Sequence, residues 1–157
     1  MLLVVVAFGL IYTRRIRQKN RKLYEQIMLL QKAECQPVAE TTTEEANPLY
    51  NSICELMLHE RLYTFADLSR DDLATRLGTN RTYIADAVRE GSGGLSFQQF
   101  LTAYRVNHAT RLLAETDDSI EQIAFASGFN SRQVFARAFR DQHGLSPSDF
   151  RQARHNL

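Results

Sequence analysis

Tryptophan is absent from this 157-residue sequence, and proline and cysteine are scarce, with three and two residues. Because alternating runs of β-branched residues are also few, the sequence predicts an all-α fold. The two cysteines, Cys35 and Cys54, have neither the spacing of a metal cluster nor the number needed for a disulfide framework. We therefore expect a reducing compartment.

The features that mark an enzyme are missing as well. No nucleophile stands beside a plausible base, and no glycine-rich loop is placed to hold a phosphate. His108 follows an apolar helical stripe, and no second ligand is spaced to join it, so we interpret it as a buried, hydrogen-bonded core residue. The sequence predicts no catalytic residue, no cofactor and no metal site, and hence a protein that is not an enzyme.

Positive charge is in little excess, and its distribution is more informative than its sum. The formal net charge is +1, which by itself neither favours nor excludes nucleic acid. All three lysines precede residue 33, and every later cation is arginine. Arginine suits planar, bidentate recognition, whereas lysine acts as a point charge. The second part of the chain therefore favours a partner that is read by directed hydrogen bonds.

Hydrophobic residues form one long run, MLLVVVAFGLIY, at the start of the chain. As a helix it would span about 18 Å, short of the roughly 30 Å of a bilayer core. Because the basic stretch TRRIRQKNRK follows the run, we interpret residues 1–13 as the inner end of a transmembrane helix that begins elsewhere. This predicts a single-pass protein of the cell inner membrane with the rest of the chain in the cytoplasm. A buried hydrophobic helix is the alternative.

Residues 14–35 are expected to form a basic juxtamembrane helix. Several of its residues fit the a and d positions of a short parallel coiled coil: Ile16, Asn20, Leu23, Ile27 and Leu30. This helix could pair with its copy in a homodimer, or it could be a solvated helix without a constant partner, and the sequence leaves both interpretations open. Residues 36–48 lack periodicity and are rich in Thr and Glu, so we expect a linker.

The stretch 119–147 is predicted to form two short helices joined by a tight turn. Ser119 and Gln122 have the spacing of a capping box ahead of the first helix. Gly128 supplies the permissive backbone of the turn, and Asn130 is the expected cap of the second helix. This is the pattern of a helix-turn-helix unit.

The spacing around that turn occurs twice. Ala124 stands four residues before Gly128, and Val134 stands six after it. The same three positions recur 50 residues earlier as Ala74, Gly78 and Ile84. A single match would be weak evidence, but two in one domain predict a pair of helix-turn-helix units.

The second helix of each unit is expected to bury one face and expose the other. The predicted inward residues are Tyr83, Ile84, Ala87 and Val88 in the first unit and Val134, Phe135, Ala138 and Phe139 in the second. The predicted outward residues are Arg81, Thr82, Ala85, Asp86 and Arg89 in the first and Arg132, Gln133, Ala136, Arg137 and Arg140 in the second. Arginine and glutamine can pair bidentately with guanine and adenine edges in the major groove, so these faces predict a DNA-binding protein. Asp86 is better explained by an ion pair with Arg89 than by base contact.

A long helix is predicted between the units, beginning at the capping box of Ser96 and Gln99. About 20 helical residues extend roughly 30 Å, close to the roughly 34 Å between successive major-groove faces of B-DNA. One chain could therefore reach two consecutive turns of a duplex.

Residues 49–154 resemble the DNA-binding domain of the AraC family of bacterial transcription regulators. The resemblance rests on DLATRLGTNRTYI, YRVNHATRLL and IAFASGFNSRQVFARAFRDQHGLSPSDFR. It implies sequence-specific binding of double-stranded DNA by two recognition helices, with Arg140 facing phosphate. The positions that it implies for base reading are Arg81, Thr82, Ala85 and Asp86 in the first helix and Arg132, Gln133, Ala136 and Arg137 in the second. The hydrophobic start is similar to membrane-anchored members that carry an upstream sensor, which implies signal transduction and RNA polymerase as a further candidate partner.

Two alternatives remain open. Ala85 and Asp86 stand where many members of the family carry larger donors, so the first unit could mainly position the domain while the second supplies most specificity. Since helix-turn-helix shapes also bind proteins, a helical adaptor that contacts a protein partner through the arginine-rich face is the rival function.

Overall fold

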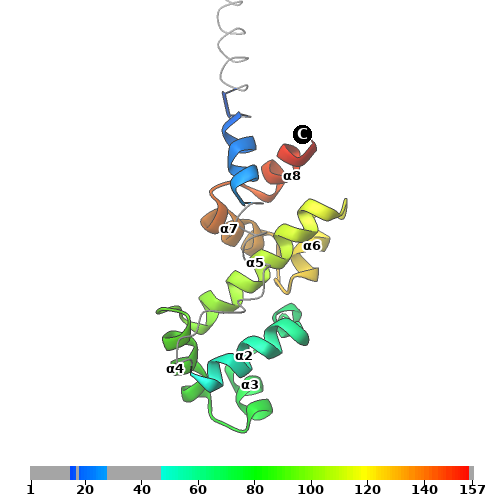
Figure 1. Cartoon of the computed structure of the whole chain (residues 1–157). Helices are drawn as coiled ribbons and strands as arrows, with labels where there is room; N and C mark the ends of the chain where they lie inside the picture. Colours follow the sequence, from blue (N-terminus) through cyan, green and yellow to red (C-terminus); the bar gives the residue numbers. More distant parts are fainter. Residues whose placement is uncertain (1–14, 17, 28–46, 156–157) are drawn as a thin grey trace, which may run out of the picture.

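The computed structural model describes residues 15–16, 18–27 and 47–155, and the regular structure in these ranges is entirely helical (Figure 1). A helix that we call the N-terminal helix comprises the first two ranges. It is followed by α2 (Pro48–His59), the 3-10 turn η1 (Leu62–Thr64), α3 (Arg70–Leu77), α4 (Arg81–Gly91), α5 (Phe97–Glu115), α6 (Ile120–Ala126), α7 (Arg132–His143) and α8 (Pro147–His155). The predicted all-α fold with two helix-turn-helix units on a long linking helix is confirmed.

Side-chain caps set the starts of these helices. The predicted capping boxes are present at Ser96 with Gln99 and at Ser119 with Gln122. The hydroxyl of Ser131 accepts a hydrogen bond from the backbone N–H of Val134. The prediction that Asn130 caps α7 was therefore wrong by one residue, and this shift changes the register of the helix that follows.

Two separate cores share the helix α5. The first core lies among α2, η1, α3, α4 and the first half of α5, and its fully buried side chains include Ile53, Met57 and Ile84. The second lies among α6, α7, α8 and the rest of α5, around Phe135 and Phe139. Figure 1 shows α5 running between the two groups of helices. Because one continuous helix contributes to both cores, it sets the placement of one unit relative to the other.

Arg105 on α5 joins the two units through backbone carbonyls. It is only 9% exposed, and its Nε donates to the carbonyl oxygen of Tyr63 at 2.8 Å. Its Nη2 donates to the carbonyl oxygens of Phe65 at 2.8 Å and Ala66 at 3.2 Å. Gly128, in the turn of the second unit, packs against the same segment. The guanidinium therefore fixes the segment after η1 at the point where the units meet.

Replacing Arg105 with lysine is expected to lower the free energy of unfolding by about 2 kcal/mol. An ammonium group is a single point donor and cannot reach the three carbonyls at once, so buried acceptors lose charge-assisted bonds. Chemical denaturation of the R105K variant measures the loss. R111K, at an exposed position on the same helix, should change stability by less than about 0.5 kcal/mol. Equal stability of R105K and the unchanged protein would show that Arg105 does not join the units.

Arg154 ties α8 to the end of α5 in a similar manner. Its Nη1 donates to the carbonyl oxygens of Leu113, Ala114 and Thr116 at 3.1, 3.0 and 2.8 Å, and its Nη2 pairs with the carboxylate of Asp117. The last carbonyls of a helix lack intrahelical partners, so this arginine satisfies groups that α5 would otherwise leave open. Arg105 and Arg154 are thus structural, although their residue type alone would place them with the DNA-binding arginines.

His143 is held neutral inside the second unit. Its Nε2 lies 3.0 Å from the hydroxyl of Thr110, and its ring lies edge-on to Phe139 at 4.6 Å. Burial lowers the pKa of His143 to about 4 from the ordinary value of 6.5. His108 is also partly buried against Tyr63, but its buried Nδ1 has no hydrogen-bond partner within the described residues, so the predicted hydrogen-bonded core histidine was wrong in that detail.

Acid is expected to destabilise the domain through His143. Between pH 6.5 and about 4 the unfolded chain binds a proton at this position and the folded chain does not. The part of the free energy of unfolding that is linked to His143 is therefore fully present above pH 6.5. It decreases as the pH falls towards 4, by about 2 kcal/mol after allowing for the partly exposed ring. Urea denaturation at pH 7.5 and pH 4.5 measures the difference. The H143Q variant should lose this part of the pH dependence, and an unchanged pH dependence in H143Q would contradict the assignment.

The N-terminal helix packs on the second unit, which the sequence did not predict. The ring of Tyr24 lies 4.7 Å from that of Phe150, and Tyr24 and Ile27 are only 7% and 6% exposed. Leu23 also packs against this core. Of the predicted coiled-coil positions, Leu23 and Ile27 thus contact the chain's own domain, while pairing of residues 14–35 with a second copy stays a prediction.

The predicted inner-membrane location is corrected. Within residues 15–16, 18–27 and 47–155, no helix has both the length and the apolar character that crossing a bilayer requires. The predicted partial transmembrane segment, residues 1–13, lies outside the described residues, as does most of the predicted linker 36–48. The end of that linker, Asn47 and Pro48, forms the cap and the first residue of α2.

Candidate DNA interface

Helix α4 presents a mixed polar face. Asn80 caps it by accepting from the backbone N–H groups of Thr82 and Tyr83. Of the predicted outward residues, Arg81, Thr82 and Arg89 are exposed, and Ala85 and Asp86 are partly exposed. Opposite them, Ile84, Ala87 and Val88 are buried, as predicted.

Helix α7 presents a more basic face. Of its predicted outward residues, Arg132, Gln133, Arg137 and Arg140 are exposed and Ala136 is partly exposed. Phe135 and Phe139 on the opposite side are 0% exposed. Packing of these two rings fixes the rotation of α7 about its axis, so the arginines are held outward by the core.

The turn of the second unit is one residue longer than the turn of the first. Asn80 caps α4 and Ser131 caps α7, so the recognition helices repeat with an offset of 51 residues, whereas the preceding glycines, Gly78 and Gly128, repeat with an offset of 50. Ile84 therefore corresponds to Phe135 rather than to Val134. This explains why the aliphatic spacing predicted from the sequence fails in the second unit.

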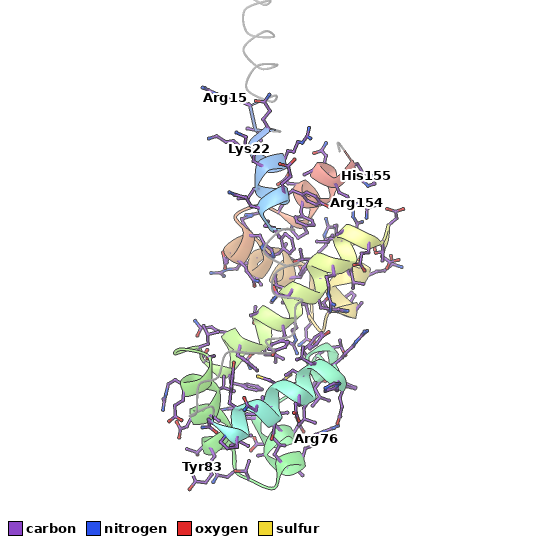
Figure 2. The ribbon with its side chains drawn as sticks, in the orientation of Figure 1. Arg15, Lys22, Arg76, Tyr83, Arg154 and His155 are labelled. Atoms are coloured by element: carbon purple, nitrogen blue, oxygen red, sulfur yellow. The ribbon has the colours of Figure 1, made fainter. Side chains whose placement is uncertain are left out.

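Tyr83 and Val134 are corrections to the predicted inward faces. Tyr83 is 60% exposed and Val134 is 57% exposed, and Figure 2 shows Tyr83 at the surface of the first unit. Each is the third residue of its helix, about 130° around the axis from the centre of the outward face. They lie between the outward and the buried faces of their helices, and alignment of the two helices by their caps, Asn80 and Ser131, makes Val134 the counterpart of Tyr83.

The charges differ between the two faces. On α4, Arg89 donates to the carboxylate of Asp86 at 2.6 Å, which confirms the predicted ion pair and leaves Arg81 as the cation without an ion pair on that face among the described residues. On α7, the contact of Arg137 with Asp141 is 4.0 Å long, with both side chains largely exposed. Such a pair contributes little and costs little to break, so Arg137 is available to a ligand.

The linking helix α5 carries both units. The 19 residues of α5 extend about 28 Å. In the view of Figure 1, α4 and α7 lie on the left of the molecule, and α2 and α6 lie on the right. Helix α4 packs with the first half of α5, and the end of α7 meets the middle of α5, where Gln142 and His143 contact Asn107 and Thr110. The arrangement offers two polar helix faces carried by one stiff helix, as a protein that follows a duplex over successive major grooves requires.

Fold and surface together define a double helix-turn-helix, DNA-binding class of protein. The chain belongs to the helix-turn-helix domain family, whose model matches residues 73–153. Solved neighbours show that the domain is of the AraC type.

Curated relatives are transcription regulators by name. An uncharacterized HTH-type transcriptional regulator of Bacillus subtilis, YtdP, is 27% identical over 151 residues, which cover 89% of this chain and 19% of that protein. An uncharacterized HTH-type transcriptional regulator of Staphylococcus aureus is 33% identical over 101 residues, covering 64% of this chain and 13% of that protein. The chain thus spans a fifth or less of the length of these relatives.

Solved structures share the fold over most of their length. The C-terminal domain of AraT, a response regulator from Geobacillus stearothermophilus, has a TM-score of 0.64 and 25% identity, covering 71% of this chain and 89% of that one. An AraC-type regulator from Chromobacterium violaceum has a TM-score of 0.60 and 28% identity, covering 68% and 92%. The DNA-binding domain of AdpA, a global transcriptional factor solved with a target DNA, has a TM-score of 0.60 and 29% identity, covering 70% and 95%.

Proposed function

We propose that this chain is the sequence-specific DNA-binding part of a transcription regulator, with α4 and α7 in successive major grooves of one duplex. The observation that carries the proposal is the face of α7, where Arg132, Gln133 and Arg137 are exposed on the side opposite two fully buried phenylalanines. The likeness to AdpA, whose DNA-binding domain was solved with a target DNA, supports it.

The proposed contacts divide into base reading and positioning. The base-reading set is Arg81, Thr82, Ala85 and Asp86 on α4 and Arg132, Gln133, Ala136 and Arg137 on α7, while Arg89 and Arg140 complete the interface towards phosphate. Arginine and glutamine can read guanine and adenine edges, and the small side chains can contact a thymine methyl group. Phosphate contacts set the register on the duplex and carry no sequence information directly.

The second unit is proposed to supply most of the specificity. The carboxylate of Asp86 is occupied by Arg89, so the middle of α4 has few free donors. The middle of α7 offers Arg137, whose one ion pair within the part of the chain that the structure describes is long and exposed. The first unit then mainly orients the domain.

Domain bounds and further partners are also proposals. The double helix-turn-helix domain would extend from residue 49 to residue 154, within the helices that run from Pro48 to His155. RNA polymerase and a second copy of the chain are proposed partners of the regulator.

The test is selection of duplexes from a random library by the intact chain, followed by titration of the selected site at several salt concentrations. We expect enrichment of a site with two blocks about one helical turn apart, and affinity that falls steeply with salt because each neutralised phosphate releases counterions. Absence of any sequence preference, together with weak salt dependence, would favour the protein-binding adaptor and overturn the proposal.

A further inference from the structure

The N-terminal helix has two faces that differ in character. Leu23, Tyr24 and Ile27 pack against the second core. Arg15, Lys19 and Lys22 are exposed, and their spacing of four and three residues places them on one face of the helix. At 100° per residue this basic face is centred roughly 120° around the axis from the apolar one, so docking of the helix leaves it open.

Docking sets the N-terminal helix beside the end of α7. A Cδ atom of Leu23 lies 3.5 Å from where a Cβ on Gly144 would stand. Gly144 ends α7, and its N–H donates to the carbonyl oxygen of Arg140 at 2.8 Å, one turn earlier in the helix. The N-terminal helix therefore contacts α7 within a turn of Arg140, an exposed arginine of the proposed interface.

The N-terminal helix also lengthens the molecule along the line that joins the first unit to the second (Figure 2). Figure 2 shows it projecting beyond the second unit, at the end of the molecule opposite the first unit, with Arg15 farther out than Lys22. Lys22 stands seven positions after Arg15, a rise of about 10 Å along a helix, which is about three base pairs of a duplex.

We propose that the docked N-terminal helix is a third DNA-contacting element, whose basic face binds the phosphate backbone next to the half-site of the second unit. The inference rests on the proposed DNA-binding function and extends it to a surface outside the helix-turn-helix units. A duplex carries one negative charge per about 1.7 Å of its axis, so it is the complementary partner for three cations spread along about 10 Å. These contacts add affinity and footprint length without adding sequence preference, because phosphates carry no base information.

Charge-neutralised variants of the intact chain test the proposal. The combined variant R15Q/K19Q/K22Q is expected to bind the selected duplex roughly 10- to 100-fold more weakly near 0.15 M salt, with a salt slope lower by about 2 to 3, at about 0.9 per lost phosphate contact. The selected sequence should stay the same. The matched control is R21Q, because Arg21 lies off the basic face and pairs with Glu25 at 3.1 Å, and its salt slope should fall by less than about 0.5.

A second variant tests whether the helix must be docked, independently of its charge. Y24S/I27S keeps all the cations but removes the two buried apolar side chains that dock the helix, leaving only the partly buried Leu23. An undocked helix of this length is marginal in water. Hydroxyl-radical footprinting should then lose about three base pairs of protection beside the second half-site, while protection over the two units remains.

The outcomes distinguish this inference from the proposed function. If the unsubstituted chain shows no sequence preference, the proposed DNA-binding function itself is contradicted. Retained preference with an unaltered salt slope in the triple variant, or an equal loss per charge in R21Q, would overturn the role of the basic face. A full-length footprint in Y24S/I27S would overturn the requirement for docking.

Discussion

Replacing Arg137 with alanine is expected to weaken binding to the selected duplex by about 1 to 3 kcal/mol, or roughly 5- to 150-fold. Arg137 lies in the middle of the exposed face of α7, and its contact with Asp141 is too long and exposed to compete with a base. A bidentate bond to a guanine edge contributes a large share of the discrimination at one position of a site. Fluorescence anisotropy titrations of R137A and the unchanged protein measure the loss.

Specificity is the sharper readout for Arg137. Repeating the selection with R137A should relax the preference at one position in the half-site read by the second unit and leave the other half-site unchanged. The matched control is R76A, since Arg76 pairs with Glu60 at 2.6 Å and lies in Figure 2 on the side of the first unit away from α4. Equal losses in R137A and R76A would mean that α7 does not read bases.

Replacing Gly128 with alanine is expected to cost more than about 3 kcal/mol of stability and to lower the midpoint of thermal unfolding by more than about 10 °C. The backbone φ of Gly128 is +84°, a region that L-residues enter at a cost of about 1 to 2 kcal/mol. A Cβ there would also stand 2.3 Å from the carbonyl oxygen of Tyr63. That oxygen is held by Arg105, so it cannot move away without breaking the bond that joins the units.

Gly78 provides the matched control for Gly128. It ends α3 at the equivalent turn of the first unit with a φ of +63°, and a Cβ there would have no atom within 4 Å. G78A should therefore carry only the backbone cost, about 1 kcal/mol. Calorimetry of both variants separates backbone strain from the close approach of the two units, and equal losses would show that the contact with Tyr63 is unimportant.

Local signals in the sequence predicted most of the helix boundaries. The starts of α5 and α6 are predicted by two capping boxes, Ser96 with Gln99 and Ser119 with Gln122. In each box the serine hydroxyl, the glutamine amide and two backbone N–H groups form hydrogen bonds with one another within one turn. The failure at α7 has a local cause as well. Asn130 and Ser131 are both good caps, so the two residue types do not decide between them.

Long-range contacts were beyond the reach of sequence patterns. Arg105 looks like any other arginine until its partners, 39 to 42 residues away, are known. Leu23 and Ile27 have heptad spacing, but an apolar stripe does not specify whether it packs against a second copy or against α7 and α8. Exposure on α4 and α7 was easier to predict, because helical periodicity separates the buried from the exposed residues within a single helix.

The central claim is that α5 holds two recognition helices at a fixed separation on one face of a duplex. The most direct test inserts five base pairs, about half a helical turn, between the two half-sites of the selected duplex and measures the affinity of the intact chain. Because the insertion turns one half-site to the opposite face, we expect affinity to fall to that of a duplex with a single half-site. Affinity that is unchanged by the insertion would contradict the claim.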